Sequence, residues 1–374
     1  MDNTAKKKKY MLEALELAAR GFGAVEPNPM VGCVIFKDDK VIGRGWHKQF
    51  GEAHAEINAL ADCCRGHSFD SHGASMCVTL EPCCHQGKTA PCTEAIIAAG
   101  ISRVYIAMVD PSDKVAGKGI EQLRNAGVEV GVGLCEKLAE KLNPAFIKYS
   151  KTHRPWVILK WAQTIDGKLD GARPEHKCIS GEMSRKDVHK TRRSCQAILV
   201  GINTVVADDP LLTARPDKGK KLLRVVLDNE LEIPVESKLL NTVEQGDVLI
   251  VTTEDAFRAK QQKVEQIVNK GAEIFAAKSD SAGFCDLDDV LSELGRRGVQ
   301  RLLVEGGREV IGAFLKKDLA DELNIYIAPK IYGSKGRIDI SDTLAGIDLA
   351  NEFLDVQTGL FDNDVKIRAI LKKY

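Results

Sequence analysis

The sequence predicts two α/β domains in tandem. The chain has 374 residues, which is more than one ordinary hydrophobic core accommodates. Segments with strand-like and helix-like patterns alternate through the first half, break at a polar, basic connector over 143–155, and then alternate again. Such alternation is typical of layered α/β domains. We therefore expect one domain over residues 1–150 and a second over residues 151–374.

In the first half, apolar residues at helical spacing predict a surface helix over Tyr10–Arg20, with Gly21 as its stop. Asp38 and Asp39 separate two short strands and indicate a hairpin. The expected strands are Val31–Phe36, Val41–Gly43, Ser75–Leu80, Arg103–Met108 and Val128–Val130, and the further expected helices are His54–Cys64, Thr93–Ala99 and Ile120–Ala126.

The second half repeats this alternation without an internal repeat or a low-complexity segment. The expected strands are Trp156–Trp161, Ala197–Gly201, Arg224–Leu227, Val248–Val251, Arg301–Glu305 and Glu322–Ala328. The expected helices are Ser184–Arg192, Asp255–Lys270, Leu287–Arg297 and Arg308–Lys317.

Composition excludes several classes of protein. Lys plus Arg and Asp plus Glu number 53 each, and this balance argues against a protein that grips a nucleic-acid backbone. The four lysines at 6–9 precede an amphipathic pattern, not the apolar run of a secretory signal, and no apolar stretch suits a membrane span. Eleven cysteines, an odd count in a long chain, fit reduced thiols. We expect a cytoplasmic protein with no nucleic-acid or membrane partner.

One histidine and two cysteines form the most informative pattern in the chain. His54, Cys83 and Cys92 offer an imidazole and two thiolates, a donor set suited to tetrahedral zinc with a fourth position left for water. Glu56 follows His54 by two residues, so both reach one metal only if it lies over the N-terminus of their helix. Cys92 opens the next predicted helix, whose N-terminus also favours a thiolate.

This pattern suits hydrolytic removal of an amino group from a nitrogen heterocycle. Zinc lowers the pKa of a bound water to about 7, and Glu56 would take its proton and deliver protons to the ring nitrogen and the leaving ammonia. The signature of zinc deaminases is His-x-Glu with Pro-Cys-x-x-Cys, but eight residues separate Cys83 from Cys92 here. Alternatives remain open: Cys84 or His85 could complete a structural site or replace a ligand, and the cluster could hold no metal.

Longer motifs run through nearly the whole chain. They are Pro27-Asn28-Pro29, Gly43-Arg44-Gly45, His54-Ala55-Glu56, the segment 79–92, Lys160-Trp161-Ala162, the segment 201–215 and Glu305-Gly306-Gly307. These motifs resemble the bifunctional riboflavin-biosynthesis deaminase–reductase family. The resemblance implies a cytidine-deaminase-like layered α/β/α domain followed by a dihydrofolate-reductase-like α/β domain. The implied reactions are zinc-dependent deamination of 2,5-diamino-6-ribosylamino-4(3H)-pyrimidinone 5′-phosphate and NADPH reduction of the ribosyl group of 5-amino-6-(5-phosphoribosylamino)uracil to ribityl.

For the first domain, the resemblance implies zinc ligands His54, Cys83 and Cys92 and proton carrier Glu56. It also implies that three residues contact the pyrimidine or its ribosyl phosphate, namely Asn28, His47 and Lys88. Asn28 could instead only hold a turn, since it lies between two prolines, and His47 could be a satisfied loop histidine.

For the second domain, the residues alone show only a strand, a glycine pair and a helix N-terminus, an arrangement that can hold a phosphate. No G-x-G-x-x-G follows a strand. The resemblance implies a substrate site of His176, Arg192, Leu212, Arg215 and Glu305. It implies an NADPH site of Ala162, Cys178, Thr204, Asp208, Gly307, Arg308, Glu309, Val310, Ile311, Gly312 and Ala313.

Arg192 and Arg215 suit a clamp on a sugar phosphate, with a surface ion pair as the alternative for each. Cys178 stands where the family often has an aromatic residue, which leaves the packing on the cofactor open. Asp166 and Glu305 are the possible general acids. We further expect a homo-oligomer, a dimer or a tetramer. Two rival functions are a nucleic-acid base deaminase with an appended domain and a zinc-stabilised binding protein.

Overall fold

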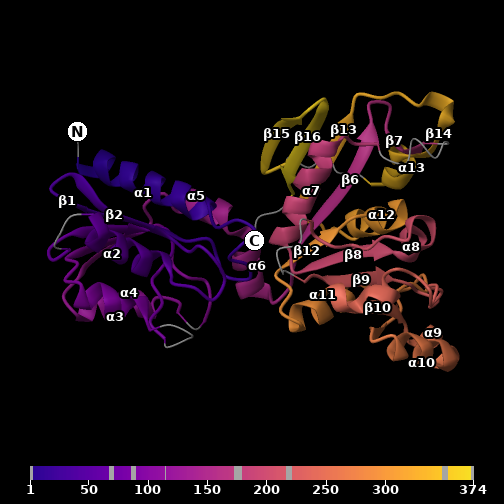
Figure 1. Cartoon of the computed structure of the whole chain (residues 1–374), viewed down its shortest axis with the longest axis horizontal. Helices are drawn as coiled ribbons and strands as arrows, with labels where there is room; N and C mark the ends of the chain where they lie inside the picture. Colours follow the sequence, from indigo (N-terminus) through magenta and orange to yellow (C-terminus); the bar gives the residue numbers. More distant parts are fainter. Residues whose placement is uncertain are drawn as a thin grey trace. The chain divides into compact units, whose positions relative to one another are not determined.

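The computed structural model describes residues 3–66, 71–85, 90–113, 115–171, 179–215, 221–347 and 353–371. The chain divides into two compact units, Met1–Thr152 and His153–Tyr374 (Figure 1). Each unit contains its own main β-sheet and its own hydrophobic clusters.

Unit 1 is built on a five-stranded sheet with the order β2-β1-β3-β4-β5. Strand β1 is antiparallel to both of its neighbours, whereas β3, β4 and β5 are parallel. The turn between β1 and β2 contains Asp38 and Asp39, both with positive φ, as tight hairpin turns require. The strands are β1 (Gly32–Lys37), β2 (Lys40–Trp46), β3 (Ser75–Val78), β4 (Arg103–Ile106) and β5 (Glu129–Val132).

Helices cover both faces of this sheet, because successive strand residues point to opposite faces and both sets are apolar. Figure 1 shows α1 and α5 on one face and α2, α3 and α4 on the other. Gly45 allows a close approach of α2, since a Cβ at this position would overlap the carbonyl oxygen of Ala55. The helices are α1 (Asn3–Ala19), α2 (Ala55–Gly66), α3 (Cys92–Ala98), α4 (Lys118–Asn125), α5 (Glu136–Leu142) and α6 (Pro144–Thr152).

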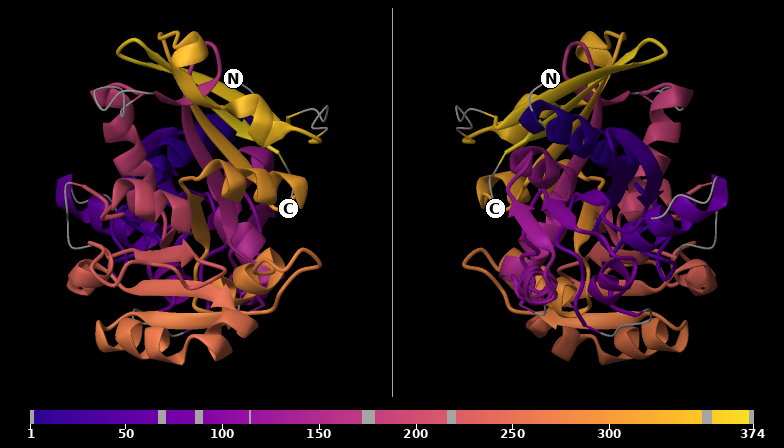
Figure 2. Two further views of the ribbon diagram at one scale, coloured as in Figure 1. Left: turned by 90° about the vertical axis from the view of Figure 1, so that its right-hand side faces the viewer. Right: turned by 90° about the vertical axis from the view of Figure 1, so that its left-hand side faces the viewer.

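Unit 2 contains a nine-stranded sheet with the order β11-β10-β9-β8-β12-β6-β13-β16-β15. The strands from β11 to β13 are parallel, and the C-terminal hairpin β15–β16 adds two antiparallel strands at the end that Figure 2 shows in yellow. The strands are β6 (Trp156–Thr164), β8 (Ala197–Gly201), β9 (Leu223–Leu227), β10 (Val248–Thr253), β11 (Glu273–Ala277), β12 (Arg301–Val304), β13 (Glu322–Ala328), β15 (Asp355–Phe361) and β16 (Asp364–Ile370).

Two hydrophobic clusters lie on the two faces of the large sheet. One joins the strands to residues of α11 and α12, and the other includes residues of α10. A separate two-stranded sheet pairs β7 (Lys168–Gly171) with β14 (Gly336–Asp339). The helices are α7 (Glu182–Ser194), α8 (Ile202–Asp208), η2 (Leu240–Gln245), α9 (Glu254–Ala259), α10 (Gln261–Asn269), α11 (Leu287–Arg296), α12 (Arg308–Lys316), η3 (Gly333–Lys335) and α13 (Ile340–Leu344).

Two sequence predictions of secondary structure are wrong. The expected connector over 143–155 is largely the helix α6, which begins with Pro144 at a position where proline suits a helix and buries Ala145 and Ile147. The single helix expected over Asp255–Lys270 is broken into α9 and α10, because Lys260 has a non-helical ψ of 46°.

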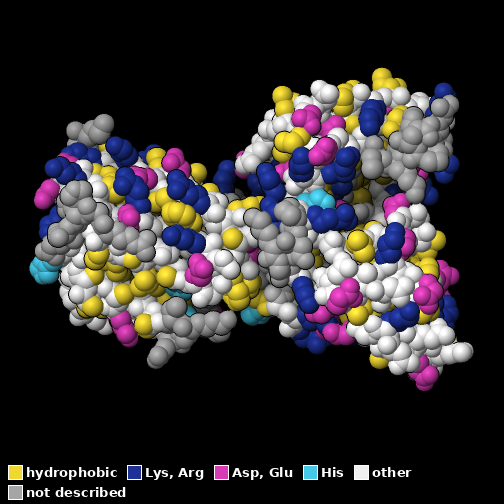
Figure 3. Space-filling view, in the orientation of Figure 1, with side chains coloured by type: hydrophobic (Ala, Val, Ile, Leu, Met, Phe, Trp, Pro, Cys, Tyr) yellow, Lys and Arg dark blue, Asp and Glu magenta, His cyan; other side chains and the backbone are white. Residues whose placement is uncertain are grey.

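Acidic and basic side chains are interspersed on the face of the molecule shown in Figure 3. This pattern agrees with the equal totals of the two kinds of charge. Within the described parts of the chain, no helix is both long and apolar enough to cross a membrane.

Candidate active sites

His54, Cys83 and Cys92 lie together in unit 1, with one ligand atom of each within 4.8 Å of the others. The His54 Nδ1 atom is 3.3 Å from the Cys92 sulfur and 3.5 Å from the Cys83 sulfur. In a tetrahedral zinc site with ordinary bond lengths, a nitrogen and a sulfur ligand are about 3.5 Å apart. The two nitrogen–sulfur distances therefore match those of a tetrahedral zinc site.

Two helix N-termini meet at this cluster. His54 directly precedes α2, so its imidazole and the first-turn residue Glu56 reach the same point in front of the helix. Cys92 is the first residue of α3, and its backbone N–H points at the Cys83 sulfur at 3.4 Å. Both helix N-termini favour negative charge, so this position stabilises the thiolate form of the ligands.

No fourth protein ligand joins the cluster among the residues that the structure describes. Cys84 and His85, the two alternatives from the sequence, are both described and lie outside it. The donor set therefore suits a zinc ion that keeps one position open, as catalytic zinc sites do. It does not match a closed structural site with four protein ligands.

Glu56 lies beside the cluster with its side chain almost fully buried, since the residue is 3% exposed. Its carboxyl group interacts with His54 and with the Cys92 thiol. Burial raises the pKa of Glu56 above its ordinary value, and the nearby His54 opposes this effect in part. A raised pKa makes a carboxyl group a stronger base, and so better suited to take up and return a proton as a general acid–base group does.

The predicted substrate residues Asn28 and His47 are in contact beside the cluster. His47 Nδ1 is 3.1 Å from the carbonyl oxygen of Ala53, so this nitrogen carries the proton. His47 Nε2 then accepts from the Asn28 amide at 3.2 Å, and the ring packs edge-on against His54. His47 is thus satisfied and orients Asn28. The third predicted residue, Lys88, lies outside the described residues.

A buried carboxylate that the sequence analysis did not assign holds the Cys83 loop. Glu81 is 3% exposed and accepts hydrogen bonds from the backbone N–H groups of Asp110, Gly117, Gly119 and Ile120 at 2.9–3.2 Å. It therefore ties the segment before Cys83 to the start of α4. The sequence contained one indication that Glu81 is important, because it belongs to the same motif as Cys83, but it did not indicate the partners of Glu81.

Replacing Glu81 by glutamine should weaken zinc retention about 10- to 100-fold, the usual effect of changing a group that orients a metal ligand. The amide keeps the shape of the side chain, but its NH₂ group cannot accept from the backbone N–H groups. Zinc affinity can be measured by competition with a chelator, with Glu94→Gln on α3 as the control. Equal zinc affinity in E81Q and in the unmodified protein would contradict this role.

In unit 2, the predicted cofactor residues gather where neighbouring parallel strands end. Ala162 lies near the end of β6, Thr204 follows β8 on α8, and Gly307 follows β12. These three strands are adjacent in the order β8-β12-β6, and ligands of open α/β sheets bind outside such strand ends. Gly307 has a φ of 46°, and a Cβ on it would lie 3.5 Å from Thr204 Oγ1.

The remaining predicted cofactor residues differ in their surroundings. Arg308 and Glu309 are exposed, as is Asp208 at the end of α8. Ile311 is 2% exposed and belongs to the hydrophobic core, so only its backbone could face a cofactor. Val310, Gly312 and Ala313 lie on the same helix, α12. His176 and Cys178 lie outside the described residues.

Arg192 on α7 forms a bidentate ion pair with Glu305. The Nε and Nη2 atoms donate to the two carboxylate oxygens at 2.6 and 2.9 Å, and Nη1 donates to the carbonyl oxygen of Thr213 at 2.8 Å. Burial alone would raise the pKa of Glu305, but the charge and hydrogen bonds of Arg192 outweigh it, and the pKa is lowered. The pair is largely buried and so is not the surface ion pair that was the alternative.

Arg215 differs from Arg192 because its guanidinium has no hydrogen-bond or ion-pair partner among the described residues. It lies in the connection between α8 and β9, as does Leu212, whose backbone has a φ of 52° in the left-handed region. The loop borders a cavity of about 240 Å³, and Arg215 is therefore a cation available to an anionic ligand. The cavity is lined by Leu211, Leu212, Thr213, Ala214, Arg215, Leu222, Arg224 and Gln245.

Lys160 is a further cation in this region. It lies on β6, and its ammonium group is 5.8 Å from the ring centre of Tyr326. Burial lowers the pKa of Lys160, while the charge of Glu305 raises it and that of Arg192 lowers it. The sequence contained a signal for this residue, because Lys160 is the one charged residue in the predicted strand Trp156–Trp161. A lysine is rarely buried in a strand unless it has a partner.

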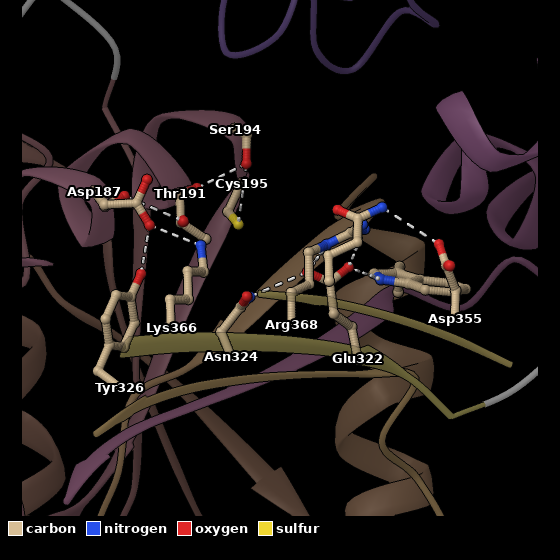
Figure 4. A network of polar contacts seen from close by, with 12 residues as sticks. Asp187, Thr191, Ser194, Cys195, Glu322, Asn324, Tyr326, Asp355, Lys366 and Arg368 are labelled. Atoms are coloured by element: carbon tan, nitrogen blue, oxygen red, sulfur yellow. Dashed lines mark hydrogen bonds and ion pairs between the residues drawn. The ribbon is translucent and has the colours of Figure 1, made fainter. Parts of the chain in front are cut away.

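Helix α7 is held by contacts at several points along its length. Figure 4 shows Asp187 of this helix, which accepts hydrogen bonds from the hydroxyl group of Tyr326 at 2.6 Å and from the ammonium group of Lys366 at 2.7 Å. At its start, Asp364 accepts from the Gly181 N–H and the Ser184 hydroxyl, both at 2.6 Å. These contacts fix the helix that carries Arg192.

Unit 1 combines a layered α/β fold with a zinc-type donor set, and unit 2 brings polar groups to the ends of parallel strands. Together they define a deaminase joined to a reductase. Residues 4–108 match the family model for the cytidine and deoxycytidylate deaminase zinc-binding region, and residues 155–363 match that for the RibD C-terminal domain. The chain belongs to the RibD family of riboflavin biosynthesis proteins.

Relatives match over most of their length. The riboflavin biosynthesis protein RibD of Aquifex aeolicus is 42% identical over 357 residues, which cover 95% of each chain, and that of Escherichia coli is 36% identical over 88% of this chain and 89% of its own. The solved structure of Acinetobacter baumannii RibD has a TM-score of 0.82 at 34% identity, and it matches over 98% of this chain and 99% of its own. The Thermotoga maritima diaminohydroxyphosphoribosylaminopyrimidine deaminase/5-amino-6-(5-phosphoribosylamino)uracil reductase has a TM-score of 0.81 at 35% identity, with the same coverage.

Proposed function

We propose that this protein catalyses two consecutive steps of riboflavin biosynthesis. Unit 1 would deaminate 2,5-diamino-6-ribosylamino-4(3H)-pyrimidinone 5′-phosphate, and unit 2 would reduce the ribosyl group of the product to ribityl with NADPH. The observation that carries the proposal is the cluster of His54, Cys83 and Cys92 beside the buried Glu56, followed in the same chain by the reductase fold.

In the deamination, His54, Cys83 and Cys92 would hold zinc, which supplies a water acidic enough to lose its proton near neutral pH. Glu56 would take that proton and pass it to the ring nitrogen. It would then carry the second proton, from the added hydroxyl group, to the amino group, which leaves as ammonia. Asn28, oriented by His47, would offer the substrate its carbonyl oxygen and the second N–H of its amide, because the first N–H is bound to His47. Burial of Glu56 and His47 keeps bulk water away from these transfers.

In the reduction, the turn at Gly306 and Gly307 and the start of α12 would hold NADPH, the source of the hydride. Arg215 would bind the substrate phosphate, because its guanidinium is exposed next to the cavity. Arg192 would act mainly by holding Glu305 and the Thr213 carbonyl in place. Glu305 and Asp166 were the two acids expected for the proton transfer. The structure does not favour this role, because hydrogen bonds from Thr164 and two backbone N–H groups lower the pKa of Asp166, and Arg192 lowers that of Glu305.

The test is to incubate the purified protein with the diaminopyrimidine substrate, first without NADPH and then with it. Ammonia should be released without NADPH, and NADPH should be oxidised only after deamination. Elemental analysis should find one zinc per chain, and a chelator should stop ammonia release while the reduction of supplied deaminated substrate continues. Absence of zinc, or reduction that needs zinc, would contradict the proposal.

We also propose that the protein works in the cytoplasm as a homo-oligomer, a dimer or a tetramer. All the cysteines that the structure describes are free thiols, which fits a reducing compartment. Sedimentation of the purified protein would distinguish a monomer from these assemblies.

A further inference from the structure

His189 contacts the loop that presents Arg215. It lies on α7, one turn before Arg192, and its Nδ1 atom accepts a hydrogen bond from the backbone N–H of Arg215 at 3.2 Å. A neutral imidazole with its proton on Nε2 is required for this bond. Burial and the charges of Arg192 and Arg215 lower the pKa of His189, which favours this neutral form.

The loop needs such support because its backbone is strained. Leu212 has a φ of 52°, and a residue other than glycine in this region persists only where its surroundings hold it. Three side chains fix alternate residues of the loop. Arg224 donates to the carbonyl oxygen of Leu211, Arg192 donates to that of Thr213, and His189 accepts from the N–H of Arg215.

We propose that His189 is a positioning residue for phosphate binding in the reductase site, and that it acts by fixing the backbone of Arg215. The proposal rests on the proposed function, since it takes the anion at Arg215 to be the substrate phosphate. Without the bond from the Arg215 N–H to His189, the Arg215 peptide is free to turn, and the side chain of Arg215 loses its fixed position beside the cavity.

Asparagine is the conservative replacement, because its Oδ1 atom occupies the place of the histidine Nδ1 and accepts a hydrogen bond. His189→Ala removes the acceptor, and His189→Asn keeps it. Lys190→Ala, an exposed neighbour on the same helix, is the matched control. The probe is ribose 5-phosphate, whose Kd can be measured by calorimetry, with ribose as the ligand that lacks the phosphate.

H189A should weaken binding of ribose 5-phosphate about 5- to 10-fold, the effect of one lost hydrogen bond. It should also raise the reductase KM by a similar factor and leave kcat and ribose binding unchanged. H189N and K190A should stay within about 2-fold of the unmodified protein. In an Arg215→Ala background, H189A should add less than about 2-fold, because His189 acts through Arg215.

The proposal is wrong if H189N is impaired as much as H189A, or if the effects of H189A and R215A multiply. It is also wrong if R215A weakens ribose 5-phosphate binding and H189A does not. A different result would bear on the proposed function. If ribose 5-phosphate binds through Arg215 and His189 but the protein never oxidises NADPH, the reductase assignment is wrong. The role of His189 in phosphate binding would still stand.

Discussion

Glu56→Gln should lower the rate of deamination at least 10²-fold while zinc stays bound, because general acid–base groups contribute about 10²- to 10⁴-fold. Glutamine keeps the size of the side chain but can neither take up nor release a proton at the ring. Glu56 lies in the first turn of α2, is 3% exposed and neighbours His54 and Cys92. Among the described residues, the metal cluster contains no carboxyl group that could replace it. Ammonia release and zinc content should be measured on the same preparation.

The reductase of the same protein is the internal control for E56Q. When the deaminated substrate is supplied, the variant should oxidise NADPH at the normal rate. Glu52→Gln is a matched control, since this residue precedes His54 by two positions and is exposed. Unchanged ammonia release in E56Q would remove Glu56 from the mechanism, and loss of zinc would mean that Glu56 is needed to build the site.

Arg192→Ala should have the largest effect in unit 2, on both stability and reduction. The side chains of Arg192 and Glu305 are 13% and 8% exposed, and removing one partner of a buried ion pair costs about 3–5 kcal/mol. The variant also loses its charge-assisted bond to Thr213, so reduction should fall about 10- to 10²-fold. Thermal or urea unfolding and NADPH oxidation check the two effects separately, and deamination should be unaffected.

The double variant R192A/E305Q separates the effect of Arg192 on stability from its effect on reduction. Glutamine removes the buried charge that R192A leaves unpaired, so much of the lost stability should return while reduction stays slow.

The stability of R192A should also depend on pH differently from that of the unmodified protein. Without Arg192, burial would raise the pKa of Glu305 in the folded state above its unfolded value, so the stability deficit of R192A should shrink as the pH falls. A deficit that is the same at all pH values would contradict an unpaired carboxylate.

The parts of the fold that the sequence predicted best are the buried strands. Strands β8 and β13 have the expected bounds. Strand β8 is a continuous apolar run, and in β13 apolar residues alternate with Glu322 and Asn324 before an apolar end, and both patterns indicate strands. The helices α5, α8 and α13 and the strands β7, β11, β14, β15 and β16 were not predicted. Strands β15 and β16 are partly exposed on an edge hairpin, where β16 pairs with β13 and β15 pairs with β16, so pairing sets their pattern more than burial does.

The candidate metal site was predicted from the sequence because its donors are few, chemically distinctive and close to helix starts. The support for these residues was not predictable. The four N–H groups that bind Glu81 come from residues 110–120, and no pattern within residues 79–92 indicates them. Arg192 suited phosphate by its chemistry, but its partner Glu305 is far away in the sequence, and only the adjacency of α7 and β12 reveals the pair.

The C-terminal hairpin forms the edge of the large sheet and also holds helix α7 in place. Strand β16 supplies Asp364 at the start of α7 and Lys366 along it, although these residues are far in sequence from every residue assigned to chemistry. A stop codon shortly before β15 would therefore spare all the reacting groups and still remove the contacts of Asp364 and Lys366 with the helix that carries His189 and Arg192. We expect such a truncated gene product to lose more of its reductase activity than of its deaminase activity.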